Sequence, residues 1–378
     1  MKIPFNKPAF IENSKNEILS SLESGNLSGR GPFTLKVEEL LLQQNPKVSK
    51  ILLSTSCTHA LEASAILLDL KPGDEVIVPS YTFVTSALAF YMHGAAIRFC
   101  DVRKDTLNID ETLIEGLITK KTKAIVVVHY AGVSCEMDEI MKIAKKYNLK
   151  VIEDNAHGLF GKYKGNNLGS IGDLSTHSFH ETKNFSCGEG GALFVRNKDF
   201  VERAEIIFEK GTNRSMFLNG QVDKYTWVDK GSSYIMSDIL AALLYSQLLF
   251  YKKIQSKREL LWKNYFDQLS NWSKVNEIQL PFVPNYCEQA FHMFYMLMPS
   301  NQVRTEFIKY LAKNNISSVF HYLPLDSSSM GASIRLDDQA DCTISKEVSQ
   351  CIVRLPLFFD LNLNDQEKVI STVTKFKV

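Results

Sequence analysis

Residues 124–154 read AIVVVHYAGVSCEMDEIMKIAKKYNLKVIED, and this stretch determines the class of fold. Ala124 to Val128 is apolar without interruption and rich in β-branched residues, Glu136 to Tyr147 has the spacing of an amphipathic helix, and Val151-Ile152 returns to a strand. Uninterrupted apolar strands that alternate with helices are typical of a parallel sheet covered on both faces. We therefore expect an α/β fold.

The same alternation continues outward from this stretch. Further strands are expected at Ile51–Leu53, Glu75–Pro79, Ala96–Val102, Asp173–Phe179 and Ala192–Val195. A long helical pattern then runs from Met236 to about Tyr265, and strand-like segments follow at His292–Met298 and Ile316–Tyr322. Because the order of elements changes within the long helix, we predict a large domain over residues 1–245 and a smaller α+β domain over residues 246–378.

Composition excludes several classes of function. Lys and Arg number 43 against 42 Asp and Glu, so the net charge of +1 provides no general field for nucleic acid. The seven cysteines are scattered and form no Cys-x-x-Cys pair, which favours reduced thiols and a cytoplasmic protein. No signal-like segment or apolar run of membrane-spanning length is found, so we expect no membrane association.

Three features along the chain have the residue types of a small-molecule site. The turn Ser54–Thr58 joins a strand to a helix N-terminus, where free backbone N–H groups favour an anion, although Thr58 as a plain helix cap is an open alternative. Asp154 follows a buried strand, at the sheet edge where ligands bind in such folds; a cap or a buried ion pair is the structural alternative. Lys183 lies between a strand and the glycine turn Gly188–Gly191.

These three features together meet the needs of pyridoxal 5′-phosphate (PLP). The coenzyme requires a lysine amine that bonds to its aldehyde carbon, a carboxylate that keeps its ring nitrogen protonated, and donors for its phosphate. Lys183 would also move the proton, and its amine must then be neutral. His177 and His180 face opposite sides of a strand, so we expect no metal site there.

Longer motifs make the resemblance to a known family specific. Glu153-Asp154-Asn155-Ala156-His157, Ser178-Phe179-His180-Glu181-Thr182-Lys183-Asn184 and Gly188-Glu189-Gly190-Gly191 resemble the signature of the DegT/DnrJ/StrS family of PLP-dependent nucleotide-sugar aminotransferases. The resemblance implies the aspartate-aminotransferase-like architecture known as fold type I, and a homodimer with both active sites at the interface.

The resemblance also implies roles for individual residues. Lys183 matches the catalytic lysine, and Asp154 matches the partner of the ring nitrogen. Phe83 matches the aromatic position that stacks on the ring, with a plain core phenylalanine as the alternative. The other implied coenzyme contacts are His157, Ser178, Thr58, the backbone N–H of Cys57 and, from the neighbouring subunit, Ser233. The implied substrate contacts are His321 and Tyr322. Arg30 is a further candidate for substrate binding on the residues alone, since it offers a charge in the Gly- and Pro-containing loop Leu27–Phe33, although this loop also reads as a plain surface turn.

Three positions depart from the family pattern. The family commonly has glycine where Cys57 stands, asparagine at the place of Ser233 and histidine at the place of Asp326. The first departure bears on how closely the backbone approaches the phosphate, because glycine has no side chain to keep a ligand away. The other two leave the phosphate and sugar contacts at those positions in question.

Four further motifs, at Pro79–Val84, Val128–Val133, Lys210–Ser215 and Gln221–Trp227, resemble family members that aminate a dTDP-linked sugar of surface polysaccharides such as enterobacterial common antigen or O-antigen. The implied reaction moves nitrogen from L-glutamate to C4 of dTDP-4-dehydro-6-deoxy-D-glucose, giving dTDP-4-amino-4,6-dideoxy-D-galactose and 2-oxoglutarate. Open alternatives are a 3-keto sugar, the opposite C4 stereochemistry, a UDP-linked sugar, or a PLP-binding regulator without turnover. A related sugar dehydratase carries histidine at the lysine position, and Lys183 argues against it.

Overall fold

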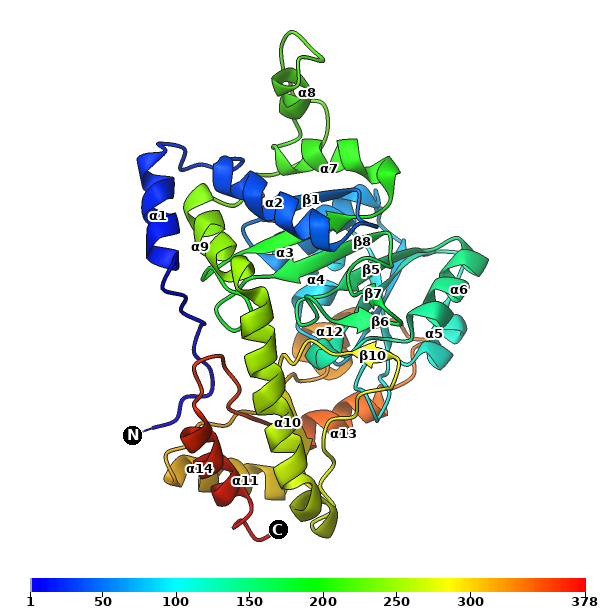
Figure 1. Cartoon of the computed structure of the whole chain (residues 1–378). Coiled ribbons are helices and arrows are strands. Elements are labelled where there is room, and N and C mark those ends of the chain that lie inside the picture. Colours follow the sequence, from blue (N-terminus) through cyan, green and yellow to red (C-terminus); the bar gives the residue numbers. More distant parts are fainter. Residues whose placement is uncertain (1) are drawn as a thin grey trace.

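The computed structural model describes residues 2–378, and its centre is a seven-stranded sheet (Figure 1). The strands, in spatial order, are β1 (Lys50–Ser54), β9 (Gly191–Val195), β8 (Leu174–Ser178), β5 (Lys150–Asp154), β4 (Thr122–Val128), β2 (Glu75–Pro79) and β3 (Ala96–Cys100). Strands β8, β5, β4, β2 and β3 are parallel, whereas β9 runs antiparallel to both β8 and β1. The predicted α/β fold with a mostly parallel sheet is confirmed.

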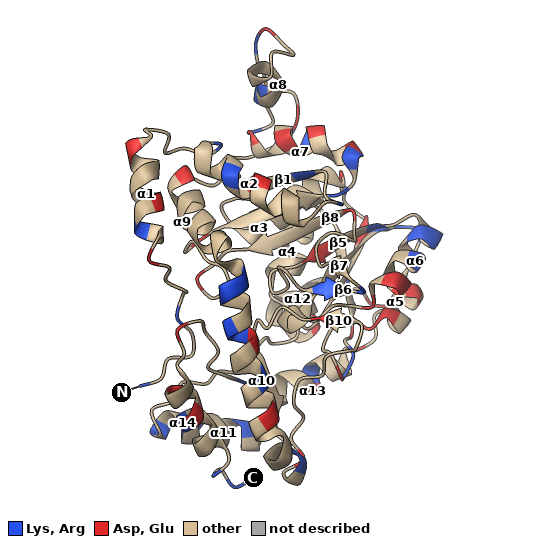
Figure 2. Cartoon of the chain, viewed as in Figure 1, with Lys and Arg blue, Asp and Glu red and all other residues tan. Residues whose placement is uncertain are grey.

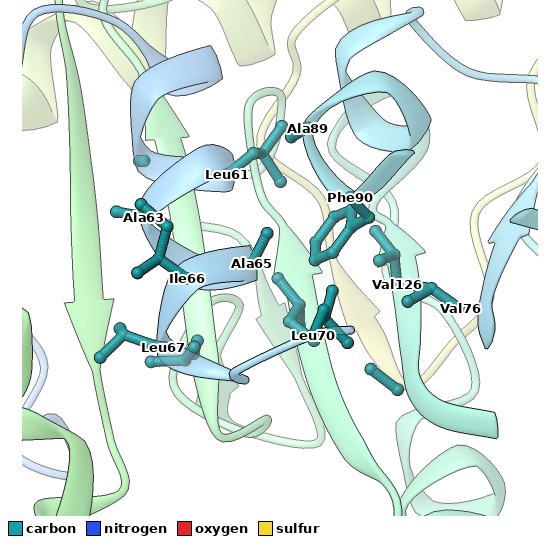
Figure 3. Close-up of a cluster of buried hydrophobic side chains, with 14 of the residues drawn as sticks. Leu61, Ala63, Ala65, Ile66, Leu67, Leu70, Val76, Ala89, Phe90 and Val126 are labelled. Atoms are coloured by element: carbon teal, nitrogen blue, oxygen red, sulfur yellow. The ribbon is translucent and has the colours of Figure 1, made fainter. Parts of the chain in front are cut away.

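Helices cover this sheet because its strands are apolar on both sides. They are α1 (Ser14–Glu23), α2 (Pro32–Gln44), α3 (Cys57–Leu67), α4 (Thr85–Met92), α5 (Glu111–Leu117), α6 (Met137–Tyr147), α7 (Val201–Phe208) and α9 (Asp238–Leu249). Figure 3 shows one resulting cluster, in which Leu61 of α3 lies beside Ala89 of α4, and Phe90 of α4 lies beside Val126 and Val76 of the sheet. This packing fixes α3, and with it the turn that precedes the helix.

The C-terminal part is built around a separate two-stranded sheet. Its elements are α10 (Tyr251–Val275), β11 (Phe294–Leu297), α11 (Asn301–Lys313), α12 (Ser329–Ile334), α13 (Thr343–Cys351), β12 (Ile352–Leu355) and α14 (Leu363–Val373). Strand β11 pairs antiparallel with β12, and a hydrophobic cluster that includes Trp262, Phe294 and Phe307 surrounds them. α9 ends at Leu249, near the predicted boundary between residues 245 and 246, and we propose that boundary for the two domains.

Two predicted elements differ from the structure. The single helix expected from Met236 to Tyr265 is two helices, since α9 ends before Phe250 and α10 begins after it. The strand expected at Ile316–Tyr322 was wrong: in the described chain this segment forms only isolated bridges, from Ile316 to Ile3 and from Val319 to Arg354. A continuous strand does not form there because these bridges are to two different segments.

The segment that contains α8 (Arg214–Leu218) projects away from the rest of the chain (Figure 1). Its exposed side chains include Leu218, Tyr225 and Trp227, the last with 80% of its surface accessible.

A small sheet of β6 (Lys162–Tyr163), β7 (Asn166–Asn167) and β10 (Cys287–Glu288) joins the two parts of the chain. Figure 2 shows acidic and basic residues interspersed over the same helices. Within residues 2–378, no helix has the length and apolar character needed to span a membrane.

Candidate active site

A cavity of about 550 Å³ lies where residues of the large sheet meet residues of the C-terminal part. From the large part, its lining includes Cys57, Thr58, Phe83, Asp154, His157, Ser178 and Lys183. From the C-terminal part it includes His292, His321, Tyr322 and Arg354, and the N-terminal segment adds Phe5 and Asn6. Strands β5 and β8 are parallel neighbours that end at Asp154 and Ser178, which explains why these residues meet at one edge.

Asp154 is the buried acid of the cavity. Its Oδ2 accepts a hydrogen bond of 2.7 Å from the Ser86 hydroxyl, and its Oδ1 accepts one of 3.2 Å from the backbone N–H of Ala156. Burial raises the pKa of this carboxyl above its ordinary value, and the Ser86 hydrogen bond works in the opposite direction. Neither of the structural alternatives, a helix cap or an ion pair, is found for Asp154 in the described chain.

Lys183 lies in the turn between the antiparallel strands β8 and β9, and its amine lines the same cavity as Asp154. Its backbone N–H donates to the carbonyl of His180 at 2.9 Å, which holds the turn closed. Burial lowers the pKa of the Lys183 amine to about 8, although the nearby Cys57 and Asp154 oppose the shift. At pH 7 the ammonium form still predominates, but roughly a tenth of the amine is neutral, and this is the form that a proton-accepting lysine requires.

The N-terminus of α3 forms another wall of the cavity. Ser56, rather than Thr58, is its N-cap, since the Ser56 hydroxyl accepts a hydrogen bond of 3.1 Å from the N–H of His59. The plain-cap interpretation of Thr58 was therefore wrong, and Thr58 lies in the first turn. A side chain at Gly191 would meet the N–H of Cys57 at 2.4 Å, so glycine there lets β9 pass close to this turn.

Phe83 and His157 lie on different parts of the lining. Phe83 has 53% of its surface accessible, so it is not a core phenylalanine. His157 is buried and stacks on His292 with ring centroids 4.3 Å apart, while its Nε2 lies 3.3 Å from the Tyr322 hydroxyl. Burial holds the pKa of His157 well below its ordinary value, which keeps the ring neutral.

His321 and Tyr322, the predicted substrate contacts, line the cavity, but Asp326 does not. The His321 ring stacks on Tyr322, and its Nδ1 lies 2.6 Å from the Tyr130 hydroxyl. Asp326 is buried and accepts a hydrogen bond of 2.7 Å from the Ser80 hydroxyl. Asp326 therefore joins the C-terminal part to the loop after β2 and is not placed to contact a ligand in this cavity.

Arg30 and Ser233 lie outside the cavity in the single chain. Arg30 donates to the Ser215 hydroxyl at 2.5 Å and has Glu205 and Glu209 within 3.7 and 3.5 Å. Ser233 forms a bridge with Glu209 instead. Both residues lie near the base of the projecting α8 segment, so this chain does not supply them to its own cavity.

Among the lining or supporting residues that were not predicted from the sequence, three have polar side chains that matter for the chemistry. They are Ser86, His292 and Arg354, which reach the site from α4, from the segment before β11 and from β12. No local motif marks them, because each looks like an ordinary helix or strand residue. His177, by contrast, stacks on Phe194, and the described residues hold no group of three His, Cys, Asp or Glu side chains that could bind a metal.

The donor set can be tested for its fit to PLP. The cavity offers a buried carboxylate, an amine with a lowered pKa, and two hydroxyls at Thr58 and Ser178 beside a helix N-terminus. In the part of the chain that the structure describes, the buried Nδ1 of His157 has no hydrogen-bond partner. Such an orphaned polar atom is costly unless a ligand satisfies it. The residues present therefore fit the coenzyme.

Comparison with known proteins gives a consistent picture. The sequence model described as the DegT/DnrJ/EryC1/StrS aminotransferase family matches residues 8–374. An uncharacterised protein of Methanocaldococcus jannaschii is 34% identical, with 98% of this chain and 96% of the relative covered. A Shewanella sediminis protein named UDP-4-amino-4-deoxy-L-arabinose–oxoglutarate aminotransferase is 29% identical, with 99% of this chain and 97% of the relative covered. The structure of a Streptococcus pneumoniae protein named as a sugar aminotransferase has been solved in its PLP form. It superposes with a TM-score of 0.88 at 27% identity, with 99% of this chain and 98% of that chain covered.

Proposed function

We propose, given that the chain belongs to the DegT/DnrJ/EryC1/StrS aminotransferase family, that it transfers nitrogen from L-glutamate to C4 of dTDP-4-dehydro-6-deoxy-D-glucose. The products are dTDP-4-amino-4,6-dideoxy-D-galactose and 2-oxoglutarate, and the amino sugar serves a surface polysaccharide such as enterobacterial common antigen or O-antigen. The protein is an aminotransferase that uses PLP and acts on a nucleotide-linked ketosugar. The observation that carries the transamination is that Lys183 and Asp154 share one cavity, whereas the choice of sugar rests on the motifs at Pro79–Val84, Val128–Val133, Lys210–Ser215 and Gln221–Trp227.

Several residues of this chain would hold the coenzyme and control its charge. When bound, the coenzyme supplies an electron sink that acidifies the C–H bond beside the transferred nitrogen. Asp154 would accept the ring N–H, and the hydrogen bond from Ser86 favours the ionised form of that carboxyl group against the effect of burial. Thr58 and Ser178 donate to the phosphate, together with the N–H of Cys57.

Lys183 moves the proton at its Nζ, first away from the glutamate carbon and later to the sugar carbon. Burial favours the neutral amine that accepts the first proton. Neutral His157 would lie against the hydroxyl side of the coenzyme ring, and Phe83 would stack on the face of that ring. His321 and Tyr322, which line the same cavity from the C-terminal part, would contact the sugar nucleotide.

We also propose a homodimer with both active sites at the interface. The projecting α8 segment exposes Leu218, Tyr225 and Trp227, and burial of such a surface favours association. Arg30 and Ser233, which lie near the base of this segment and outside their own cavity, would then reach the neighbouring subunit's substrate and phosphate. Sedimentation velocity tests this: the expected species is a dimer, and a monomer at all concentrations would contradict it.

The substrate is tested by incubating the PLP-loaded protein with L-glutamate and dTDP-4-dehydro-6-deoxy-D-glucose and identifying the product by NMR. The expected product is the 4-amino sugar with the galactose configuration. A second candidate is the same chemistry on a UDP-linked ketosugar, which is favoured by the name of the Shewanella sediminis relative. Turnover of a UDP-4-ketosugar with none of the dTDP-linked one would reject the first choice and support the second.

A further inference from the structure

A second cavity, of about 870 Å³, lies between α10 and the small sheet of β6, β7 and β10 (Figure 1). Within residues 2–378 it has no lining residue in common with the catalytic cavity. We call it the α10 groove, and we propose that it is a regulatory site that binds a nucleoside diphosphate. The regulatory role rests on the proposed transamination, whereas the binding itself does not.

The lining of the α10 groove is rich in aromatic side chains, which are Phe160, Tyr251, Trp262, Phe266, Phe282 and Phe291. Phe160 and Tyr251 stack with ring centroids 4.5 Å apart, and Trp262 and Phe266 stack at 5.3 Å. The side chain of Phe282 is 47% accessible, so its ring has free surface. Mostly apolar cavities with a few polar groups are typical of small-molecule sites, and a planar ligand stacks well on aromatic rings.

The backbone is strained at two of these aromatic residues. Phe160 and Phe291 have φ angles of 67° and 50°, in the left-handed region that bulky residues rarely adopt. Both rings are only partly buried, so filling the core does not account for the strain. Strained residues gather at ligand sites, where the surrounding structure holds them in place. Here the strain directs two rings into the lining of one cavity.

The charged side chains of the groove leave one positive charge without a partner. Lys162 pairs with Glu288 at 2.9 Å, and Lys263 pairs with Glu259 at 2.7 Å. Lys252 also lines the groove, and no carboxylate of the described chain lies within 4.0 Å of it. A single unpaired lysine is ordinary on a protein surface, but this one lies at the end of a row of aromatic rings. The groove therefore suits a ligand with a flat ring and an anionic group.

The spacing of these features matches a nucleoside diphosphate. Lys252 and Trp262 lie about 15 Å apart along the axis of α10, at a rise of about 1.5 Å per residue. The diphosphate would lie beside Lys252, and the base would stack on Phe282 and Trp262. Ser256, which lines the groove between these ends, offers a hydroxyl to the ribose.

The lining of the groove contacts both residues that follow Lys183. The Oε1 of Gln255 accepts a hydrogen bond of 3.0 Å from the side-chain amide of Asn184. The ring of Phe160 meets the ring of Phe185 edge-on, with centroids 5.2 Å apart. A ligand that contacts Gln255 or stacks on Phe160 therefore acts on the turn that holds Lys183.

Calorimetric titration of the PLP-loaded protein with dTDP tests the binding. We expect Phe282→Ser and Lys252→Gln each to weaken binding in the groove about 10-fold or more. Both residues are exposed, so these variants should fold. Lys253→Gln is the matched control, because Lys253 is the exposed neighbour of Lys252 on α10 but does not line the groove. An unchanged dTDP isotherm in both groove variants would overturn the proposal.

Two measurements on the unaltered protein test the ligand chemistry. Thymidine, which lacks the diphosphate, should bind in the groove at least about 10-fold more weakly than dTDP. Equal affinity would overturn the role of Lys252. In crystals soaked with dTDP, the base should lie beside Trp262 and Phe282. Density for dTDP in the catalytic cavity alone would overturn the site.

The regulatory role is tested on the half-reaction with L-glutamate alone, which converts the bound coenzyme to its amine form and needs no nucleotide. Saturating dTDP should change its rate about 5-fold or more, as followed by absorbance. Phe282→Ser should abolish this effect, and Lys253→Gln should keep it. Binding in the groove without a change in the half-reaction would overturn the regulatory role. A normal half-reaction without turnover of the dTDP-linked sugar would instead reject only the proposed sugar.

Discussion

Replacing Ser86 by alanine removes the only side-chain donor to Asp154 in the described chain. The Ser86 hydroxyl has one proton, which goes to Asp154 at 2.7 Å, so Thr82 must donate to Ser86 across the 2.9 Å between their oxygens. A hydrogen bond to a charged group contributes about 1.5–3 kcal/mol. Its loss should raise the already elevated pKa of Asp154 further.

A protonated Asp154 lacks the negative charge that keeps the ring nitrogen of the coenzyme protonated. We therefore expect Ser86→Ala to weaken PLP binding about 10- to 100-fold in equilibrium dialysis and to move the acid limb of the kcat/KM profile to higher pH. The acid limb moves to higher pH because activity needs the carboxylate form of Asp154. This form is lost as pH falls through the pKa of Asp154, and a higher pKa brings that loss closer to neutral pH.

Ser64→Ala is the matched control, because Ser64 is also buried but donates to the carbonyl of Ala60 within α3. It should leave PLP affinity and the pH profile unchanged. If Ser86→Ala binds PLP as tightly as the unaltered protein and keeps the same acid limb, Ser86 does not control the charge of Asp154.

Two further predictions concern stability. In the coenzyme-free protein the buried Lys183 ammonium is unfavourable at pH values below about 8, so Lys183→Met should raise the free energy of unfolding by about 2 kcal/mol at pH 7. This gain in stability should shrink as pH rises from about 8 toward the ordinary lysine pKa, because the amine of the folded protein is then neutral. Urea titrations at several pH values measure it, and a gain that stays constant with pH would contradict the prediction. Asp238→Ala should lower the free energy of unfolding by about 3 kcal/mol, because Asp238 accepts from the N–H and hydroxyl of Thr34 at 2.7 and 2.9 Å. Calorimetry that finds the same melting temperature would contradict this.

The sequence predicted the parts of the site that depend on the course of a single segment. Val151-Ile152 is so apolar that a buried strand is the only stable arrangement, and Asp154 must then stand at its end. Lys183 likewise follows from a strand that reverses through a glycine turn. These positions are set by local patterns, and the structure places both side chains in one cavity.

The remaining contacts depend on packing between distant segments. Ser86 looks like a small residue in an apolar helix, and only the approach of α4 to β5 gives its hydroxyl a carboxylate partner. Arg354 reads as an ordinary polar position of a half-buried strand, although the cavity makes its charge unusual. Thr58 seemed an adequate cap, but Ser56 has the extended backbone that a cap requires.

The central claim is that Lys183 is the residue that holds the coenzyme and moves the proton. Borohydride reduction of the PLP-loaded protein fixes the coenzyme to the lysine that carries it, and peptide mass spectrometry then identifies that lysine. We expect a single modified peptide that contains Lys183, and no modification in Lys183→Ala. Coenzyme attached to a different lysine, or full transaminase activity in Lys183→Ala, would contradict the account.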